Sequence, residues 1–344
     1  MVSRTVVVTG AAGMLGSHLA ARLRADGHHV RGVDLRPGVD VAITGDVRDP
    51  VAMSRAVTGA DAVVHCASAL PSYPVAEIRS IIVDGARTVL TAAVRAGVDR
   101  VVHISSTAVY GLPRTVPTAE DHLREPVDAY SAAKTAAEEY AERLRADGTC
   151  LPIVRPKTFL GPGRMGLFAM LFEWAEEGRN FPVIGRGDVR IQMLALSDLV
   201  DAVTAVLDAP DTVANDTYNI GAASFGTLRE DFQAVLDAAG HGRRVVSVPS
   251  RPALALLGTL ERLRLSPVYG RLLHKLTADS YVCIDKARDR LGFTPRMSNQ
   301  DAILDTYAWW RDQRKEPRDA AQNTGRTSRD PWKQGALAAA KIFF

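Results

Sequence analysis

The stretch Thr9-Gly10-Ala11-Ala12-Gly13-Met14-Leu15-Gly16 decides the fold. It directly follows a β-branched apolar run and leads into a segment of helical period. Glycines at this spacing between a strand and a helix are typical of a dinucleotide site. The first makes a tight turn, the second lets the backbone approach a pyrophosphate, and the third lets helix and strand pack closely. We assign these roles to Gly10, Gly13 and Gly16, with the phosphates at the N-terminus of the helix.

The first 155 residues alternate short β-branched runs with stretches of helical period, which is typical of βαβ units around a parallel sheet. The expected strands are Val6–Val8, Val30–Val33, Ala62–His65, Val101–Ile104 and Leu151–Arg155. The expected helices are Ser17–Asp26, Pro50–Thr58, Ile78–Ala96 and Asp128–Arg145. The sequence therefore predicts an α/β fold, a doubly wound parallel sheet of the Rossmann type.

Beyond Gly161 the alternation weakens, which indicates a second, smaller lobe. We expect an NAD-binding domain over residues 1–160, to which the chain returns at about 196–222, and a substrate-binding lobe over 161–195 and 223–311. Residues 312–344 are expected to form a poorly ordered polar tail with an apolar end. The leucine-rich segment Leu254 to Leu276 is expected to be an amphipathic helical pair that covers the lobe, or an apolar lid over the substrate.

Composition and charge exclude several classes of protein. The 344 residues are 47% hydrophobic and 24% charged with a net charge of +3, so no basic surplus favours nucleic acid or an anionic membrane as a partner. No stretch reaches the roughly 18 apolar residues of a membrane span. The three cysteines match no metal-ligand spacing, and we interpret them as reduced thiols of a cytoplasmic protein. We expect a small-molecule substrate and no metal.

A carboxylate at the end of the second strand points to the nucleotide that is bound. Asp34 lies about 20 residues beyond the glycines, where it can accept both ribose hydroxyls and repel a 2′-phosphate, so it favours NAD over NADP. Arg36 is the opposing signal, and we interpret it as a solvated loop charge. Asp46 and Val47 follow a further apolar segment, where a carboxylate is useful for binding adenine.

A tyrosine and a lysine four residues apart lie on the same face of a predicted helix. The ammonium of Lys134 stabilises the phenolate of Tyr130, which brings the tyrosine pKa down from ~10 towards the range needed to exchange a proton with an alcohol or ketone. Ser106 follows the carboxyl end of a predicted strand, and doubly wound sheets bind their ligands at this edge. Its hydroxyl is suited to hold the substrate oxygen.

These motifs together resemble the extended short-chain dehydrogenase/reductase family, also called the NAD-dependent epimerase/dehydratase family. The residues that carry the resemblance are Thr9 to Gly16, Asp34, Gly45-Asp46-Val47, Ser105 to Gly111, Tyr130 with Lys134, Arg155-Pro156, Gly161-Pro162-Gly163 and Ser197-Asp198-Leu199. The resemblance implies NAD as cofactor, Tyr130 as acid/base, Lys134 on the nicotinamide ribose and Ser106 on the substrate oxygen, with Thr107 as the fallback. It also implies cofactor contacts from Met14, Leu15, Val47, Ala67 and Pro156.

The same resemblance implies a homodimer through a four-helix interface, built from the helices of Ile78 to Ala96 and Asp128 to Arg145. Both segments contain apolar and alanine-rich stretches suited to close packing.

Departures from the family pattern bear on the reaction. Sugar-nucleotide 4,6-dehydratases of the family carry an acidic pair after the catalytic hydroxyl, but Thr107 and Ala108 stand there, so dehydration of that type is not expected. The asparagine and arginine that epimerases aim at the diphosphate are replaced by Thr158 and Ile191. We take a different set as substrate-binding candidates: Ser68, Lys157, Thr158, Arg164, Arg190 and Gln192.

The sequence predicts hydride transfer at a secondary alcohol or ketone, and two substrate classes stay open. Epimerisation of a sugar nucleotide is favoured by the overall family pattern, because an altered set of cations can still bind phosphate. Oxidation or reduction of a less polar, steroid-like or polyketide-like compound is favoured by the missing clamp and the apolar Leu254 to Leu276 segment. A non-catalytic NAD-binding regulator is a third possibility, against which the intact Tyr130, Lys134 and Ser106 argue.

Overall fold

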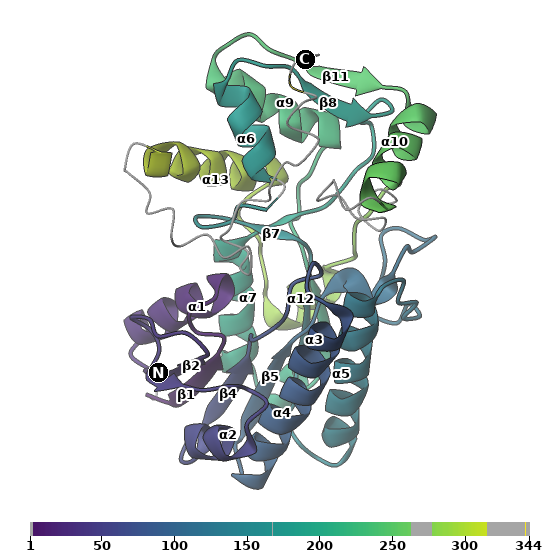
Figure 1. Cartoon of the computed structure of the whole chain (residues 1–344). Coiled ribbons are helices and arrows are strands. Elements are labelled where there is room, and N and C mark those ends of the chain that lie inside the picture. The colour runs from purple at the N-terminus through teal and green to yellow at the C-terminus, as the bar shows by residue number, and fades with distance from the viewer. Residues whose placement is uncertain (1–2, 167, 263–276, 315–340, 342–344) are drawn as a thin grey trace.

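A seven-stranded, wholly parallel sheet forms the centre of the larger domain in the computed structural model, which describes residues 3–166, 168–262, 277–314 and 341 (Figure 1). The strand order is β10-β6-β5-β4-β1-β2-β3. The strands are β1 (Thr5–Thr9), β2 (His29–Asp34), β3 (Ile43–Thr44), β4 (Ala62–His65), β5 (Arg100–Ile104), β6 (Ile153–Pro156) and β10 (Thr217–Ile220). The Rossmann-type fold is confirmed, and all five strands expected in the first 155 residues are present.

Helices cover both faces of the sheet because alternate residues of each buried strand point to opposite faces. On β1, Val6 and Val8 pack with α1 (Met14–Ala25) and α7 (Leu196–Asp208). Val7 packs on the other face with α2 (Pro50–Val57), α4 (Gly85–Arg95) and α5 (Ala129–Ala146). For this reason the central strands β1 and β4 have a continuous apolar run at their centre.

The helix expected over Ile78–Ala96 differs from the observed one. It begins earlier, as α3 (Val75–Arg79), passes through a π-helical turn, η1 (Ser80–Asp84), and continues as α4. A widened turn of this kind is not visible in a simple 3.6-residue period. Both α3 and α4 pack against α5, and the homodimer through these helices stays a prediction.

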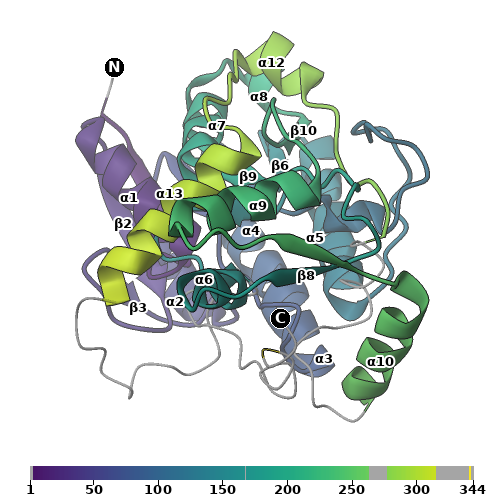
Figure 2. The same ribbon diagram turned by 90° about the horizontal axis from the view of Figure 1, so that it is seen from above.

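The second lobe lies over one edge of the sheet, and Figures 1 and 2 show α9, α13 and β8 above the Rossmann domain. Its elements are α6 (Phe168–Glu176), β8 (Phe181–Ile184), α9 (Leu228–Ala239), β11 (Val245–Val248), α10 (Ser250–Arg262) and α13 (Asn299–Arg314). Strands β8 and β11 pair in parallel. Aromatic rings dominate the lobe core: Phe181 contacts Trp174 and Phe232, and Trp310 contacts Phe172.

Short elements connect the two parts. The pair β7 (Phe159–Leu160) and β9 (Leu194–Ala195) leads into α7, and α8 (Asp211–Ala214) precedes β10. The expected lobe span 223–311 needs one exception, because α12 (Asp285–Leu291) packs against β10 and α7, and Ala287 and Phe293 join the Rossmann core.

Two regions of interest lie partly outside the described residues. The segment Leu254 to Leu276 is described only as far as the end of α10 at Arg262. Of the tail expected over 312–344, residues 312–314 form the last part of α13, and Lys341 is the other described residue. Within the described part of the chain, no helix combines the length and the apolar character needed to cross a membrane.

Candidate active site

The glycine loop after β1 has the shape of a phosphate cradle. Gly10 has a φ of +72°, and a Cβ atom there would lie 2.8 Å from the backbone nitrogen of Ala67. A Cβ on Gly16 would lie 2.1 Å from the carbonyl oxygen of Gly10, so only glycine lets α1 pack so closely on the loop. Gly13 is the N-cap of α1 and has no side chain to occupy the helix N-terminus. The space and the positive end of the helix dipole fit a pyrophosphate.

Asp34 is held beside this loop at the end of β2. Its Oδ2 accepts a hydrogen bond of 3.0 Å from the backbone N–H of Ala12, and its Oδ1 accepts one of 3.0 Å from Arg36. The Asp34 side chain is 11% exposed, so it is fixed but accessible to a ribose. The guanidinium of Arg36 stays 3.9 Å away and its side chain is 54% exposed, in keeping with a solvated charge.

The carboxylate of Asp46, which was expected to bind adenine, is hydrogen-bonded by Arg48, a contact that the sequence did not reveal. Asp46 accepts hydrogen bonds of 2.9 Å from both the backbone N–H and the Nε of Arg48, and these bonds hold the pKa of its carboxyl below the usual value. Val47 is buried. Adenine binding by Asp46 stays a prediction, and the arginine shares its oxygens.

The tyrosine and lysine lie near the start of α5, whose N-terminus is fixed by a capping box. Ser131 N donates to the Asp128 carboxylate at 2.7 Å, and Asp128 N donates to the Ser131 hydroxyl at 3.0 Å. Lys134 is 3% exposed, and its Nζ donates to the carbonyl oxygen of Ile104 at 2.9 Å and lies 6.0 Å from the Tyr130 ring centroid. Burial lowers the pKa of Lys134 to about 8. The predicted pair is therefore brought together at the carboxyl end of β5.

The candidate hydroxyls follow β5 in the short helix η2 (Thr107–Tyr110), which packs against α5. Ser106 is partly exposed, and its Oγ accepts a hydrogen bond of 3.2 Å from the N–H of Ala108. This bond orients the oxygen and leaves the hydroxyl proton to donate. Thr107 donates to the carbonyl oxygen of Pro156 at 3.4 Å and lines a small cleft whose other wall includes Ser280 and Tyr281.

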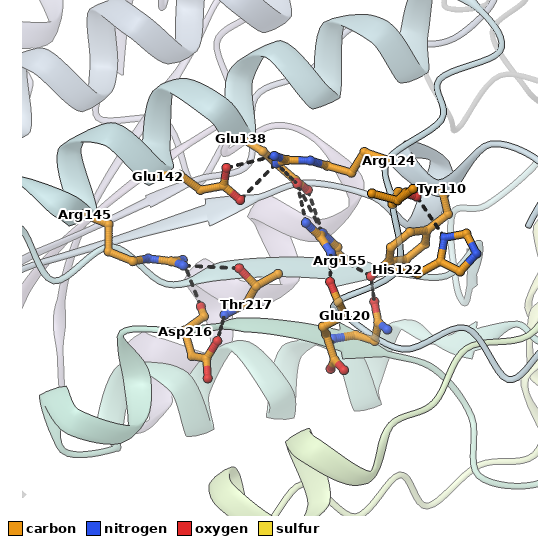
Figure 3. A network of polar contacts seen from close by, with 12 residues as sticks. Tyr110, Glu120, His122, Arg124, Glu138, Glu142, Arg145, Arg155, Asp216 and Thr217 are labelled. Carbon is orange, nitrogen blue, oxygen red and sulfur yellow. Dashed lines mark hydrogen bonds and ion pairs between the residues drawn. The ribbon is translucent and has the colours of Figure 1, made fainter.

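A buried polar network between α5 and β6 was missed by sequence reasoning (Figure 3). Glu138 of α5 is fully buried and accepts a hydrogen bond of 2.7 Å from Nη2 of Arg155 on β6. Arg155 also donates to the hydroxyl of Tyr110 at 2.7 Å, and Tyr110 donates to Asn219 at 2.8 Å. The one signal in the sequence is the position of Glu138, one helical turn beyond Lys134 on the same face.

Two of the substrate-binding candidates are committed to the backbone of the second lobe. Gln192 is 1% exposed, and its amide donates to Ala222 O at 2.7 Å and accepts from Val282 N at 2.9 Å. Lys157 is buried, and its ammonium donates hydrogen bonds to the carbonyl oxygen of Ser280 at 2.9 Å and to the hydroxyl oxygen of Ser280 at 3.0 Å. Gln192 therefore links the backbone at Ala222 to that at Val282, and substrate binding by Gln192 stays a prediction. Lys157 lines the small cleft next to Thr107.

The remaining substrate candidates contact aromatic rings or backbone groups of the protein. Arg190 is exposed, and its guanidinium lies over the rings of Phe225 and Tyr281, at 4.9 and 5.5 Å from their centroids. Arg164 lies over the ring of Phe159 at 5.6 Å. The Ser68 hydroxyl donates to Ala69 O at 3.2 Å, and the backbone carbonyl of the exposed Thr158 accepts a hydrogen bond from Leu194 N. Each of these side chains is thus engaged with other groups of the protein.

Histidines at the strand ends form part of the packing. His65 and His103 stack with ring centroids 5.6 Å apart, and Thr9 hydrogen-bonds His65 at 2.7 Å. Burial lowers the pKa of His65 to about 3 and that of His103 well below its usual value. Within residues 3–166, 168–262, 277–314 and 341, no three His, Cys, Asp or Glu side chains gather as a metal site.

Comparison with known proteins identifies the family. Residues 6–221 match the Epimerase family, described as the NAD dependent epimerase/dehydratase family. The chain belongs to this family. NAD is accordingly its cofactor, and the glycine cradle with Asp34 fits that assignment.

Relatives of the chain differ in the reactions that their names give. The uncharacterized protein y4nG of Sinorhizobium fredii is 34% identical over 98% of this chain and 85% of its own length. A UDP-glucose 4-epimerase of Mycolicibacterium smegmatis is 30% identical, covering 89% and 98%, and a 3 beta-hydroxysteroid dehydrogenase/Delta 5→4-isomerase of Mycobacterium tuberculosis is 28% identical, covering 89% and 90%. The solved structure of MoeE5 in complex with UDP-glucuronic acid and NAD is 26% identical, with a TM-score of 0.74 over 90% of this chain and 99% of that one.

Proposed function

We propose that this protein is an NAD-dependent enzyme that transfers hydride at a secondary alcohol or ketone. The observation that carries the proposal is the buried Lys134, fixed by Ile104 O at 2.9 Å beside the ring of Tyr130. A structural lysine gains little from such a position, because burial disfavours its charged form. A phenolate needs such a neighbour, because the ammonium lowers the cost of its charge.

Each residue has a defined role in the proposed reaction. Tyr130 takes the hydroxyl proton of an alcohol, or returns one to a ketone. Ser106 holds the substrate oxygen through its hydroxyl proton, and Lys134 stabilises the phenolate and binds the nicotinamide ribose. Bound NAD supplies the acceptor for the hydride. The loop of Gly10 to Gly16 and Asp34 hold the cofactor.

For the substrate, the contacts favour a compound without a diphosphate. Arg190 is engaged with two aromatic rings, Gln192 is buried in backbone contacts, and Lys157 donates to Ser280. Cations free to form charge-assisted hydrogen bonds would strengthen the binding of a second diphosphate, that of a sugar nucleotide. We therefore propose an uncharged alcohol or ketone as the first candidate substrate class, which reverses the order favoured by sequence alone.

Epimerisation of a sugar nucleotide remains the second candidate. It is favoured by the relative named a UDP-glucose 4-epimerase and by the likeness to MoeE5 in complex with UDP-glucuronic acid and NAD. For this reaction, Lys157 and Arg164 would have to leave their present contacts to bind phosphate.

One experiment separates these candidates. The protein is incubated with NAD and either hydroxysteroids and other uncharged secondary alcohols or UDP-, GDP- and dTDP-sugars, while NADH absorbance and isomer formation are both followed. We expect NADH in proportion to product from an uncharged alcohol. Isomerisation of a nucleotide sugar without net NADH would overturn the substrate class and leave hydride transfer standing. Equal rates from a Tyr130→Phe variant would overturn hydride transfer by this site.

A further inference from the structure

The catalytic helix carries a second buried ionisable side chain on the face that holds Lys134. Glu138 follows Lys134 by four residues and Tyr130 by eight, which places the three on successive turns of α5. Its side chain is fully buried. An isolated carboxylate cannot remain charged in such a place, so its partners decide what it does.

Two arginines form ion pairs with Glu138. Arg155 of β6 donates to it through Nε at 3.0 Å and Nη2 at 2.7 Å, and Arg124 donates through Nη1 at 3.2 Å. Arg124 is shared with Glu142, whose two oxygens accept from it at 2.9 and 3.0 Å. Glu138 and Glu142 together balance the charges of the two arginines. Figure 3 shows this cluster between α5 and β6.

Lys134 faces several ionisable groups besides Glu138. In the described residues these are Tyr130 on α5, His65 on β4, Cys66 directly after it, and His103 on β5. Burial lowers the pKa of both histidines and raises the pKa of Cys66 to about 12, so these three groups are uncharged at neutral pH. Glu138, which is ion-paired with Arg155 and Arg124, is the carboxylate one turn from the lysine on the same face of α5.

We propose that Glu138 is a positioning residue for the reaction, which holds Lys134 in its charged form beside Tyr130 and ties the catalytic helix to β6 through Arg155. The proposal rests on the proposed roles of Tyr130 and Lys134. The charge of Glu138 opposes the effect of burial on the pKa of Lys134. Without it, the lysine loses its proton at a lower pH, and a neutral amine no longer stabilises the phenolate.

The sign of the effect separates this role from a direct one. Glu138 is one helical turn from Lys134 and two turns from Tyr130. If its charge acted mainly on the tyrosine, its removal would make the phenolate easier to form. If it acts through the lysine, its removal makes the phenolate harder to form.

The test is an ultraviolet titration of the phenolate in the NAD-loaded protein. The phenolate absorbance of Tyr130 is obtained by subtracting the titration of each protein with Tyr130→Phe added from the titration of the same protein without it. No substrate is needed. In Glu138→Gln we expect the ionisation midpoint of Tyr130 to rise by about half a pH unit or more. Glu142→Gln is the matched control, because this partly exposed glutamate contacts only Arg124 of the cluster. In this variant the ionisation midpoint of Tyr130 should equal that of the wild type.

A second variant guards against misfolding. Glu138→Gln leaves Arg155 buried with a weakened partner, so the double variant Glu138→Gln with Arg155→Gln removes both charges. It should show a smaller rise of the midpoint in the same direction, because removing the cation of Arg155 offsets part of the effect of removing the carboxylate of Glu138. A midpoint that stays or falls in either folded variant, with a loss of thermal stability alone, would overturn the proposal. Absence of any Tyr130 signal in the wild type would instead contradict the proposed function.

Discussion

The sequence predicts the carboxyl edge of the Rossmann sheet better than it predicts the part of the second lobe around Arg190 and Gln192, here called the lobe wall. At the sheet edge, Gly10, Gly16 and Lys134 have the surroundings that their spacing predicts. In the lobe wall, Gln192 and Arg190 have polar groups suited to a substrate but direct them to backbone and aromatic rings. The difference teaches that spacing determines geometry where one motif spans a strand and the next helix. It does not do so where a side chain meets a segment ninety residues away.

The largest effect is expected at the sheet edge. Tyr130→Phe removes the proton-transfer group and keeps the ring, so turnover should fall by the 10²- to 10⁴-fold typical of a lost general acid/base. NAD affinity, measured by fluorescence titration, should stay within about threefold, because the glycine loop and Asp34 are unchanged. Loss of NAD binding together with turnover would mean that the Tyr130 hydroxyl serves cofactor binding rather than proton transfer alone.

A second experiment tests the opposite claim for the lobe wall. Gln192→Ala leaves Val282 N–H and Ala222 C=O unpaired in a buried site, which should reduce the free energy of unfolding by about 1–3 kcal/mol. Chemical denaturation measures this change, with the exposed Arg288→Ala as a control of little effect. Unchanged stability with a raised KM would show that Gln192 serves the substrate and that the two regions are alike.

These contrasts define how much the sequence could predict. The β-branched runs and the glycine loop predicted the strands and the cofactor cradle, because both patterns are local. The π turn at Ser80–Asp84 interrupts a helix without any change of composition, so periodicity could not reveal it. Glu138 resembles any charged residue on a helix until β6 brings Arg155 against it. Long-range pairs of this kind require the fold to be known first.

A smaller effect is expected on the preference for NAD over NADP when Asp34 is replaced. Asp34→Ala removes the charge that repels a 2′-phosphate and the oxygens that accept ribose hydroxyls, so the ratio of NADP to NAD affinity should rise by about tenfold. Titration of both cofactors measures the ratio. Arg36→Ala is the paired control and should lower NADP binding slightly, because its solvated guanidinium lies at the same edge. Equal affinity of the wild type for the two cofactors would show that Arg36 outweighs Asp34.

The smallest effect is expected at Arg190, where the choice between substrate classes is most sensitive. Its guanidinium lies over Phe225 and Tyr281 and its Nη2 donates to Phe225 O at 3.3 Å, so Arg190→Ala should reduce stability by about 0.5–1 kcal/mol, the range of exposed cation–π contacts. Arg186→Ala, an exposed arginine of the same segment, should change stability less.

The substrate then decides what the arginine is for. If Arg190 only packs on the two rings, the KM of an uncharged alcohol is the same in both variants. If it binds a diphosphate, Arg190→Ala raises the KM of a nucleotide sugar by tenfold or more, because a charge-assisted hydrogen bond contributes about 1.5–3 kcal/mol. Suppose that the KM of the nucleotide sugar rises in Arg190→Ala and stays unchanged in Arg186→Ala. Arg190 would then be a substrate-binding residue, and the contrast between the sheet edge and the lobe wall would no longer hold.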